Sequence, residues 1–295
     1  MLEKKSILAI VVTYHPDGSF AERFERLVGQ VGAVLIVDNG SGAAAVSMLR
    51  EAATRLNMAL ILNSENLGLA AALNIGVAHA TANDYKWALL FDQDTVPAGN
   101  IVEGLCRAYD GFPRKDRLAV IGSNYSEPHT GELRFSPLVT NGCSWKERRV
   151  VISSGSLVSL AIYRVLGPFR NEYFIDCVDL EYCLRARSKG FRIIITSEPL
   201  MVHTIGQPTK HRLPWRRIDA SDHNHIRQYY MIRNHIDLVK KYILREPAWV
   251  LASLWRRFKS IIVLCFFEDD RLAKVRYSAM GLFDGLLSDF DRKIN

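Results

Sequence analysis

Apolar and amphipathic stretches alternate regularly along the first part of the chain. Four short runs are rich in Val, Ile and Leu throughout, as expected of strands that are buried on both faces. These runs cover residues 7–13, 33–37, 59–62 and 86–91. The stretches between them have helical composition and cover residues 20–31, 43–56 and 68–80. This alternation predicts an α/β fold in which helices flank a mostly parallel central sheet with right-handed crossovers.

The later part of the chain is less regular. Residues 124–149 are rich in turn formers, which predicts loops and short strands over a binding site. Residues 174–196 indicate a loop, a short charged helix and a strand, and the chain beyond His225 has helical composition. We therefore expect a catalytic domain over residues 1–235 and a helical C-terminal extension over residues 236–295.

Three of the predicted strands end on a polar residue or just before one. These residues are Thr13, Asp38 and Asp92. The carboxyl ends of parallel strands lie at one edge of the sheet, and ligands of such sheets bind in the crevice there. We therefore expect the three side chains to converge on one binding site.

Asp92-Gln93-Asp94 follows the apolar strand 86–91 and places two carboxylates at its mouth. Burying both without a compensating positive charge would be costly. A divalent cation bound to a diphosphate would compensate them, because hard oxygen ligands suit Mg²⁺ or Mn²⁺. The alternative is a solvated acidic pair in a strand-end turn, and the motif alone favours neither interpretation.

Polar residues near the second and third strands are further candidates. Asp38 could accept hydrogen bonds from a base or ribose, or it could form an Asx-turn with the Asn-Gly-Ser that follows it. Asn66, Gly68 and Asn74 combine amide side chains with a glycine that permits close backbone approach. Helix capping explains this second group nearly as well.

The segment 174–181 places three acids beside apolar residues. A carboxylate at the edge of an apolar site can act as general base toward a hydroxyl. On a helix that begins near Asp179, Glu181 and Arg185 could pair, which would leave Asp179 facing the site. Alternatively, Asp179 only interacts with the positive end of the helix dipole.

His203 and Arg233 follow in the later part of the chain. His203 comes after an apolar run, where a lone histidine is more often structural than a ligand. Arg233 offers a fixed cation suited to a bidentate phosphate contact, or it is an ordinary surface ion-pair residue. Basic and aromatic residues at 255–259 precede an apolar run at 261–267 that is too short to span a bilayer, which fits an interfacial or a core-packed helix.

The composition narrows the classes of protein. With 295 residues and 48% hydrophobic content, the chain can bury a large core. The net charge of +7 favours phosphate-bearing substrates, anionic membranes or nucleic acid. Five cysteines without a CxxC pair suggest buried thiols rather than disulfides or a zinc ribbon. The apolar run 7–12 is too short for a secretory signal and is expected to be the first strand.

Together these residues resemble the inverting family 2 glycosyltransferases, whose fold is GT-A. The resemblance extends from about Ile7 to Asn234. It is carried by Val11-Val12-Thr13-Tyr14, Val37-Asp38-Asn39-Gly40-Ser41, Asn66-Leu67-Gly68 with Asn74, Asp92-Gln93-Asp94, the Asp179 segment and His203. Within that family, residues 91–97, 153–157 and 174–179 look most like the bacterial rhamnosyltransferases of cell-surface polysaccharide synthesis.

The resemblance implies a role for each matching residue. Asp179 would be the catalytic base, and Asp94 would bind the metal, Mg²⁺ or Mn²⁺, with His203 as a further ligand or a phosphate contact. The nucleotide-sugar would be held by Thr13, Tyr14, Asp38, Asn66, Gly68, Asn74, Asp92 and Arg233. Many family members have an acidic pair where this chain has Val178-Asp179, so Asp176 remains a substitute candidate for the base.

The same resemblance implies partners and location. The donor would be dTDP-L-rhamnose and the acceptor a lipid-linked saccharide, in the biosynthesis of O-antigen or another cell-surface polysaccharide. We expect a cytoplasmic protein in peripheral contact with the inner face of the cell membrane, without a nucleic-acid partner.

Three other functions compete with this one. Asp92-x-Asp94-x-Val96 also fits the nucleophile motif of haloacid dehalogenase-type phosphatases, with 268–270 as distal metal acids. That nucleophile normally follows the first strand, whereas three strands precede it here. Nucleic-acid binding is disfavoured because the charges are dispersed and no recognition motif is present. Redox chemistry is disfavoured because no GxGxxG follows the first strand.

Overall fold

The computed structural model describes residues 2–128, 131, 133, 135, 143–203, 223–292 and 294, together with the backbone of 209–213 and 216–220. The chain divides into two compact units. The first, here called the sheet unit, comprises Met1–Asn171 and Val178–Thr204. The second, the helical unit, comprises Glu172–Cys177 and Ile205–Asn295.

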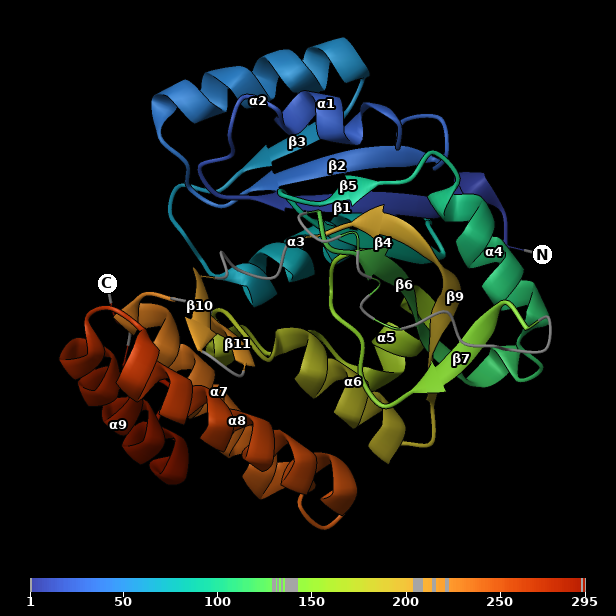
Figure 1. Ribbon diagram of the computed structural model, residues 1–295. Coiled ribbons are helices and arrows are strands. Elements are labelled where there is room, and N and C mark those ends of the chain that lie inside the picture. The colour runs from blue at the N-terminus through green and yellow to red at the C-terminus, as the bar shows by residue number, and fades with distance from the viewer. Residues whose placement is uncertain are drawn as a thin grey trace. The chain divides into compact units, whose positions relative to one another are not determined.

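A nine-stranded sheet forms the centre of the sheet unit, in the order β3-β2-β1-β4-β8-β6-β9-β5, with β7 paired to β9 (Figure 1). The strands are β1 Ile7–Thr13, β2 Ala33–Asp38, β3 Ala59–Leu62, β4 Trp87–Asp92, β5 Val96–Pro97, β6 Leu118–Ser126, β7 Trp145–Arg148, β8 Ser156–Ser159 and β9 Arg192–Val202. The four N-terminal strands run parallel, as predicted. Strands β8, β5 and β7 pair antiparallel to their neighbours, so the sheet is mixed.

The strand order reverses between β1 and β4, because β1, β2 and β3 progress in one direction and β4 returns to the other side of β1. In the register, Thr13 lies beside Asp38 and Val12 beside Asp92. The carboxyl ends of β1, β2 and β4 therefore meet at a topological switch point, where open α/β sheets bind their ligands. This confirms the predicted placement of all three polar residues.

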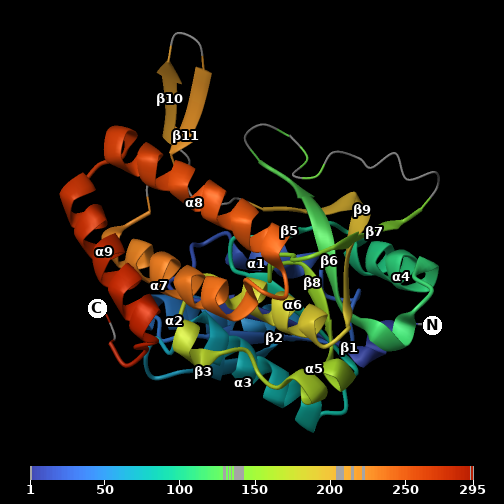
Figure 2. The ribbon, with the colours of Figure 1, turned by 90° about the horizontal axis from the view of Figure 1, so that it is seen from below.

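Helices cover both faces of the sheet. They are α1 Phe20–Glu25, α2 Ala43–Leu56, α3 Leu69–Ala82, α4 Ile101–Gly111, α5 Leu160–Leu166 and α6 Val178–Ser188. Figures 1 and 2 show α2 and α3 on opposite faces, as right-handed crossovers on the two sides of β1 require. The helix predicted over 20–31 was too long, since α1 ends at Glu25 and Gly29 adopts a left-handed φ of 88°.

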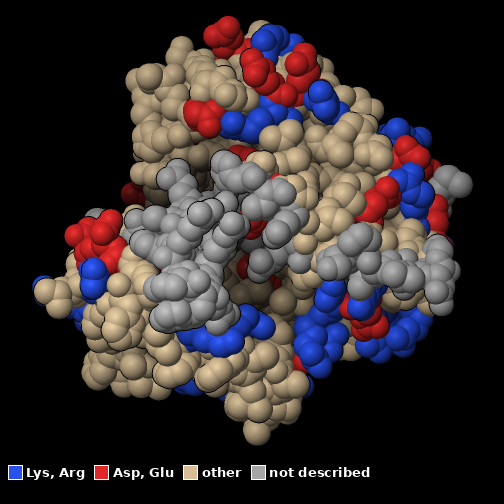
Figure 3. All heavy atoms as spheres, in the orientation of Figure 1, with Lys and Arg blue, Asp and Glu red and all other residues tan. Residues whose placement is uncertain are grey.

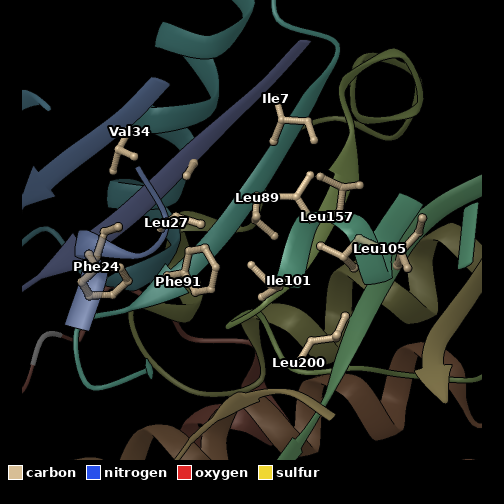
Figure 4. Close-up of a cluster of buried hydrophobic side chains, with 14 of the residues drawn as sticks. Ile7, Phe24, Leu27, Val34, Leu89, Phe91, Ile101, Leu105, Leu157 and Leu200 are labelled. Carbon is tan, nitrogen blue, oxygen red and sulfur yellow. The ribbon is translucent and has the colours of Figure 1, made fainter. Parts of the chain in front are cut away.

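The core lies between the sheet and these helices. Every residue of β1 is buried, which explains its continuous apolar sequence. Phe24 packs its ring edge-on against Phe91, with the centroids 5.8 Å apart, and Figure 4 shows both rings within the larger cluster. A Cβ on Gly76 of α3 would lie 2.5 Å from the Ile10 side chain, so glycine is needed for this close helix–strand approach.

The helical unit consists of a hairpin and three helices. These elements are β10 Thr209–Leu213, β11 Arg216–Ala220, α7 His225–Tyr242, α8 Pro247–Phe267 and α9 Arg271–Leu287. Helix α9 approaches the backbone of α7 through Gly281 and Gly285, where a Cβ would lie under 3 Å from carbonyl oxygens of α7. The Tyr229 hydroxyl donates to Asp284 Oδ2 over 2.7 Å between the same helices.

The helices confirm the predicted helical region beyond His225, whereas the hairpin was not predicted. The predicted domain boundary after residue 235 falls inside α7. How far a catalytic domain extends in function stays a prediction. Among the helices of the described residues, none is long and apolar enough to cross a membrane.

Candidate active site

Asp38 is fully buried at the end of β2, and its carboxylate organises the strand-end turn. Its Oδ1 accepts hydrogen bonds from the hydroxyls of Thr13 at 2.9 Å and Ser41 at 2.5 Å, and its Oδ2 accepts from the Ser41 amide at 2.9 Å. The structure thus contains the Asx-type turn that the sequence left as the alternative. Contacts of Thr13 and Asp38 with a base or ribose stay predictions.

The Asp92-Gln93-Asp94 turn is tied to the end of β1 through Tyr14. The Tyr14 amide donates to Gln93 Oε1 at 2.7 Å, and Gln93 Nε2 donates to the Tyr14 carbonyl at 3.1 Å. These two hydrogen bonds leave the Tyr14 ring half exposed beside His15, with the ring centroids 4.4 Å apart. An exposed aromatic ring can stack on a base. The contact of Tyr14 with the donor stays a prediction.

Asn66 and Gly68 belong to an amide network beside this turn. Asn39 Nδ2 donates to Asn66 Oδ1 at 2.8 Å, and the Gly68 amide donates to the same oxygen at 3.0 Å. Gly68 has φ +86 and is the N-cap of α3, and no side chain caps this helix end. Asn66 instead closes a turn by accepting from the amide two residues on. Donor binding by these two residues remains a prediction.

Asn74, on α3, holds a different part of the sheet unit. Its Oδ1 accepts from the Tyr163 hydroxyl at 2.6 Å and from the Phe169 amide at 3.0 Å. Its Nδ2 donates to the Phe169 carbonyl at 2.8 Å and to Asn171 Oδ1 at 2.7 Å. This amide anchors the segment that precedes residue 171, and its contact with the donor stays a prediction.

Asp92, Asp94 and His203 form a cluster at the carboxyl end of β4. One potential ligand atom from each lies within 4.8 Å of the other two. Asp94 is exposed, and its Oδ1 lies 3.8 Å from His203 Nδ1. Two carboxylates and one imidazole are a donor set that suits Mn²⁺ or Mg²⁺, so these residues fit the cation that the sequence implied.

His203 is buried, and burial lowers its pKa while Asp94 acts to raise it. Burial outweighs the carboxylate, so the imidazole is neutral near pH 7, the form that can ligate a metal. From the sequence alone, a lone histidine after an apolar run is more often structural than a ligand. The structure instead places this one in the only His/Cys/Asp/Glu group found among the described residues with metal-binding spacing.

Two buried hydroxyls behind this cluster were missed by the sequence reasoning. Thr95 Oγ1 lies 2.9 Å from His203 Nδ1 and 2.6 Å from Ser154 Oγ. Ser154 Oγ in turn accepts a hydrogen bond from the Asp92 amide at 3.2 Å. The hydroxyls therefore connect the imidazole to the backbone of the acidic turn. The rhamnosyltransferase-like motifs at 91–97 and 153–157 contain both residues, which is the signal that could have found them.

Asp179 lies in the first turn of α6, and its carboxylate is fixed at both oxygens. Oδ2 accepts from the Ser153 amide at 3.2 Å, and Oδ1 accepts from the Leu180 amide at 2.8 Å. Ser153 directly precedes Ser154, so one loop contacts both this acid and the Asp92 turn. The predicted pair also forms, because Arg185 Nη2 donates to Glu181 Oε2 at 2.9 Å.

Asp176 and Arg233 belong to the helical unit. The Asp176 carboxylate forms a two-point ion pair with Arg227, at 2.9 Å and 3.1 Å. The Arg233 side chain is buried, donates to the Glu172 carbonyl at 2.6 Å and to Asn234 Oδ1, and lies 4.8 Å and 4.9 Å from the ring centres of Tyr230 and Phe290. Arg233 is therefore not an ordinary surface ion-pair residue. Its contact with a diphosphate stays a prediction.

The sequence of the sheet unit matches a known family. Residues 9–138 match the family described as Glycosyl transferase family 2. The chain is 29% identical over 244 residues to dTDP-rhamnosyl transferase RfbF of Shigella flexneri, with 80% of each chain covered.

The fold also matches solved structures. The chain resembles mannosyltransferase PcManGT from Pyrobaculum calidifontis in complex with GDP-Man and Mn²⁺, with a TM-score of 0.58, 14% identity, and 98% of this chain and 88% of that chain covered. It resembles TarS 1-349 of S. aureus in complex with UDP-GlcNAc, with a TM-score of 0.54, 13% identity and coverage of 97% and 88%. In a longer TarS chain the match spans 39% of the length. At such identities these likenesses show the fold alone, which is GT-A.

The phosphatase alternative gains no support from these matches. Its nucleophile would be Asp92, which follows the fourth strand of the chain rather than the first. Of its supposed distal acids, Glu268 is buried in an ion pair with Lys274. The family match and the relative identify the chain as a glycosyltransferase that carries a family 2 domain.

Proposed function

We propose that the protein transfers L-rhamnose from dTDP-L-rhamnose to a hydroxyl of a saccharide acceptor, with inversion at the anomeric carbon. The choice of sugar is supported by the rhamnosyl transferase relative from Shigella flexneri. The choice of a nucleotide-sugar is supported by the GDP-Man and UDP-GlcNAc complexes of the structural neighbours.

One observation carries the proposal: the cluster Asp92, Asp94 and His203 lies at the switch point of the sheet, and the loop that supports it also holds Asp179. This loop provides its hydrogen bonds from adjacent residues, the Ser153 amide and the Ser154 hydroxyl. The proposed cation site for an anionic donor and the proposed proton acceptor are thereby held by the same loop of the sheet unit. Inverting transfer needs both.

The chemistry follows from these groups. Asp179 accepts the proton of the acceptor hydroxyl as that oxygen attacks the anomeric carbon and the bond to the diphosphate breaks. Asp94 and His203 would hold the divalent cation, Mg²⁺ or Mn²⁺. When bound, such an ion supplies positive charge for the departing diphosphate. Displacement in one step needs no covalent sugar–enzyme intermediate, which is consistent with a base rather than a nucleophile in the first turn of α6.

The proposal extends to the acceptor and the cellular setting. A lipid-linked saccharide is the proposed acceptor, in the assembly of O-antigen or another cell-surface polysaccharide. We place the protein in the cytoplasm, in peripheral contact with the inner face of the membrane. The sequence resemblance to rhamnosyltransferases of cell-surface polysaccharide synthesis and the apolar surface of the helical unit support this setting.

A pair of variants tests the proposed roles. Asp179→Asn should leave dTDP-L-rhamnose binding nearly unchanged and lower sugar transfer by about 10²- to 10⁴-fold, because it removes the general base. Asp94→Asn should abolish the Mn²⁺-dependent part of the thermal shift that dTDP-L-rhamnose produces. Transfer is measured with a radiolabelled donor, and binding is measured by thermal shift with and without Mn²⁺.

Asp176→Asn is the matched control for the base. Its carboxylate is engaged by Arg227, so we expect this variant to retain most of the transfer rate. Normal transfer by Asp179→Asn together with loss in Asp176→Asn would move the base to Asp176. A panel of nucleotide-sugars in the same thermal-shift assay tests the donor, and a larger shift with UDP-GlcNAc or GDP-mannose than with dTDP-L-rhamnose would reject it.

A further inference from the structure

Helix α8 presents its apolar side chains outward. Five large side chains, spaced three or four residues apart, lie between 42% and 68% exposed. This apolar stripe of α8 consists of Leu251, Trp255, Phe258, Ile262 and Phe266. At 3.6 residues per turn this spacing places all five on one side of the helix. A surface helix of a globular protein usually has the reverse arrangement.

The opposite side of α8 attaches the helix to the rest of the helical unit. Trp249, Val250, Ser253 and Leu264 are buried there. Ser253 Oγ lies 2.9 Å from Nε2 of the buried His235 on α7. Figure 2 shows α8 running alongside α7. The helix therefore has two apolar sides, one packed inside the unit and one exposed, and fixed packing on the inner side holds the stripe outward.

The charge around the stripe is positive. Arg256 and Lys259 are exposed, and the Lys259 Nζ lies 4.9 Å from the centre of the Trp255 ring. The sequence of α8, Pro247–Phe267, contains no Asp or Glu, and the first exposed acids after it are Asp269 and Asp270. In the space-filling view the surface over α8 is mostly tan, with blue atoms beside it (Figure 3).

A second copy of the chain is a poor partner for this surface. Arg256 and Lys259 lie near the middle of the 21-residue helix. In a two-fold pairing of α8 with α8 around its centre, the same basic residues of both copies would come together and repel. An anionic lipid surface meets both requirements, because acyl chains accept the apolar side chains and phosphate headgroups pair with the basic ones.

We propose that the apolar stripe of α8 and its flanking Arg256 and Lys259 form the surface that docks the protein on an anionic membrane. The helix would lie in the plane of the interface, with Trp255 at the level of the headgroups. This inference specifies the membrane contact of the proposed function and rests on it. Vesicle binding measures it separately from sugar transfer.

Three variants of the full chain test the surface by co-sedimentation with vesicles. Trp255→Ser/Phe258→Ser removes apolar area from the stripe without changing charge and should weaken binding to phosphatidylglycerol vesicles by at least about tenfold. Arg256→Gln/Lys259→Gln should weaken it by roughly tenfold and leave the weak binding to phosphatidylcholine vesicles unchanged. Val28→Ser/Val165→Ser, at exposed valines of the sheet unit, is the matched control and should bind as the wild type does.

Transfer to a short saccharide acceptor without lipid should be the same in all three variants and in the wild type. If the wild type does not transfer rhamnose to this acceptor, the proposed function is wrong, whereas the docking surface is unaffected. Wild-type vesicle binding by Trp255→Ser/Phe258→Ser would overturn the docking surface, and so would a wild-type dimer that this variant dissociates in sedimentation velocity. Where that variant unfolds, the result for Arg256→Gln/Lys259→Gln decides.

Discussion

The two units of the molecule differ in where their polar residues and their large exposed apolar residues are concentrated. In the sheet unit, β1 is buried throughout, and polar residues are concentrated where the strands end. In the helical unit, charged groups such as Arg233 and the Glu268–Lys274 pair are buried, whereas large apolar side chains of α8 and α9 are exposed.

This contrast indicates what each unit binds. A polar edge on an apolar core suits a charged, hydrogen-bonding ligand such as a nucleotide-sugar. An exposed apolar surface suits a partner that is itself apolar, since large contiguous apolar patches on a protein surface usually mark an interaction site.

The strongest test of the contrast is the ion pair between Glu268 and Lys274. Nζ and Oε2 are 3.0 Å apart, and both side chains are almost completely buried. Lys274→Met leaves the carboxylate buried without its cation and should lower the free energy of unfolding by about 3–5 kcal/mol. Chemical denaturation followed by circular dichroism measures this change.

The double variant Glu268→Leu/Lys274→Met is the control for that experiment. It removes both charges and replaces them with apolar groups, so its stability should return close to that of the wild type. Should Lys274→Met alone be as stable as the wild type, the pair would not be buried in solution. The burial of this ion pair inside the helical unit would then have to be rejected.

A second, somewhat smaller effect is expected from acid. Burial, followed by the nearby Arg257 and Arg256, lowers the pKa of His235 to about 4. The folded state therefore binds fewer protons than the unfolded state below the ordinary pKa of 6.5. The stability that this group contributes is present above pH 6.5 and is lost as the pH falls toward 4, by about 3 kcal/mol in total.

His235→Gln should flatten this part of the stability curve. His223, whose pKa is lowered to about 4 by burial and by Arg227, retains a similar dependence in the variant, so the curve should not become level. Unfolding free energies between pH 4 and pH 7 measure both effects. An identical pH dependence in wild type and His235→Gln would mean that this histidine is not held neutral inside the unit.

The local pattern of apolar and helical stretches was sufficient to predict the strands whose carboxyl ends form the ligand-binding edge of the sheet. Strands β1 to β4 are continuous apolar runs between helical stretches, and their parallel pairing follows from chain order. Helix α4 and most of β6 were not predicted, although both are buried elements of the sheet unit. The predicted strand at 191–196 continues to Val202, as β9.

The meeting of Thr13, Asp38 and Asp92 at the strand ends was predicted, but the pairing that brings His203 to them was not. His203 is far from Asp94 in sequence, and it reaches the acidic turn because β5 pairs antiparallel with β9, with Val96 beside Val202. Such a non-local pairing leaves no periodic signal in either segment. The environment of Arg233 could not be predicted for the same reason. The aromatic rings that enclose it include Phe290, which no local pattern connects to α7.

Thr95 connects these two lessons, since it is the residue that fixes His203 after β5 and β9 have paired. Its hydroxyl lies 2.9 Å from Nδ1 and orients the imidazole, with either group as the donor. Outer-shell partners orient metal-ligating histidines in this way. Thr95→Val keeps the shape and removes the hydroxyl, so the dissociation constant for Mn²⁺, measured by calorimetry, should rise by about 10- to 100-fold. Thr95→Ser retains the hydroxyl and should stay close to the wild type.

Equal Mn²⁺ affinity in Thr95→Val and wild type, alongside a large loss in His203→Ala, would show that packing alone orients the histidine. Mn²⁺ binding at the polar edge of the sheet unit would then depend on the exposed acids and not on the hydroxyls buried behind them.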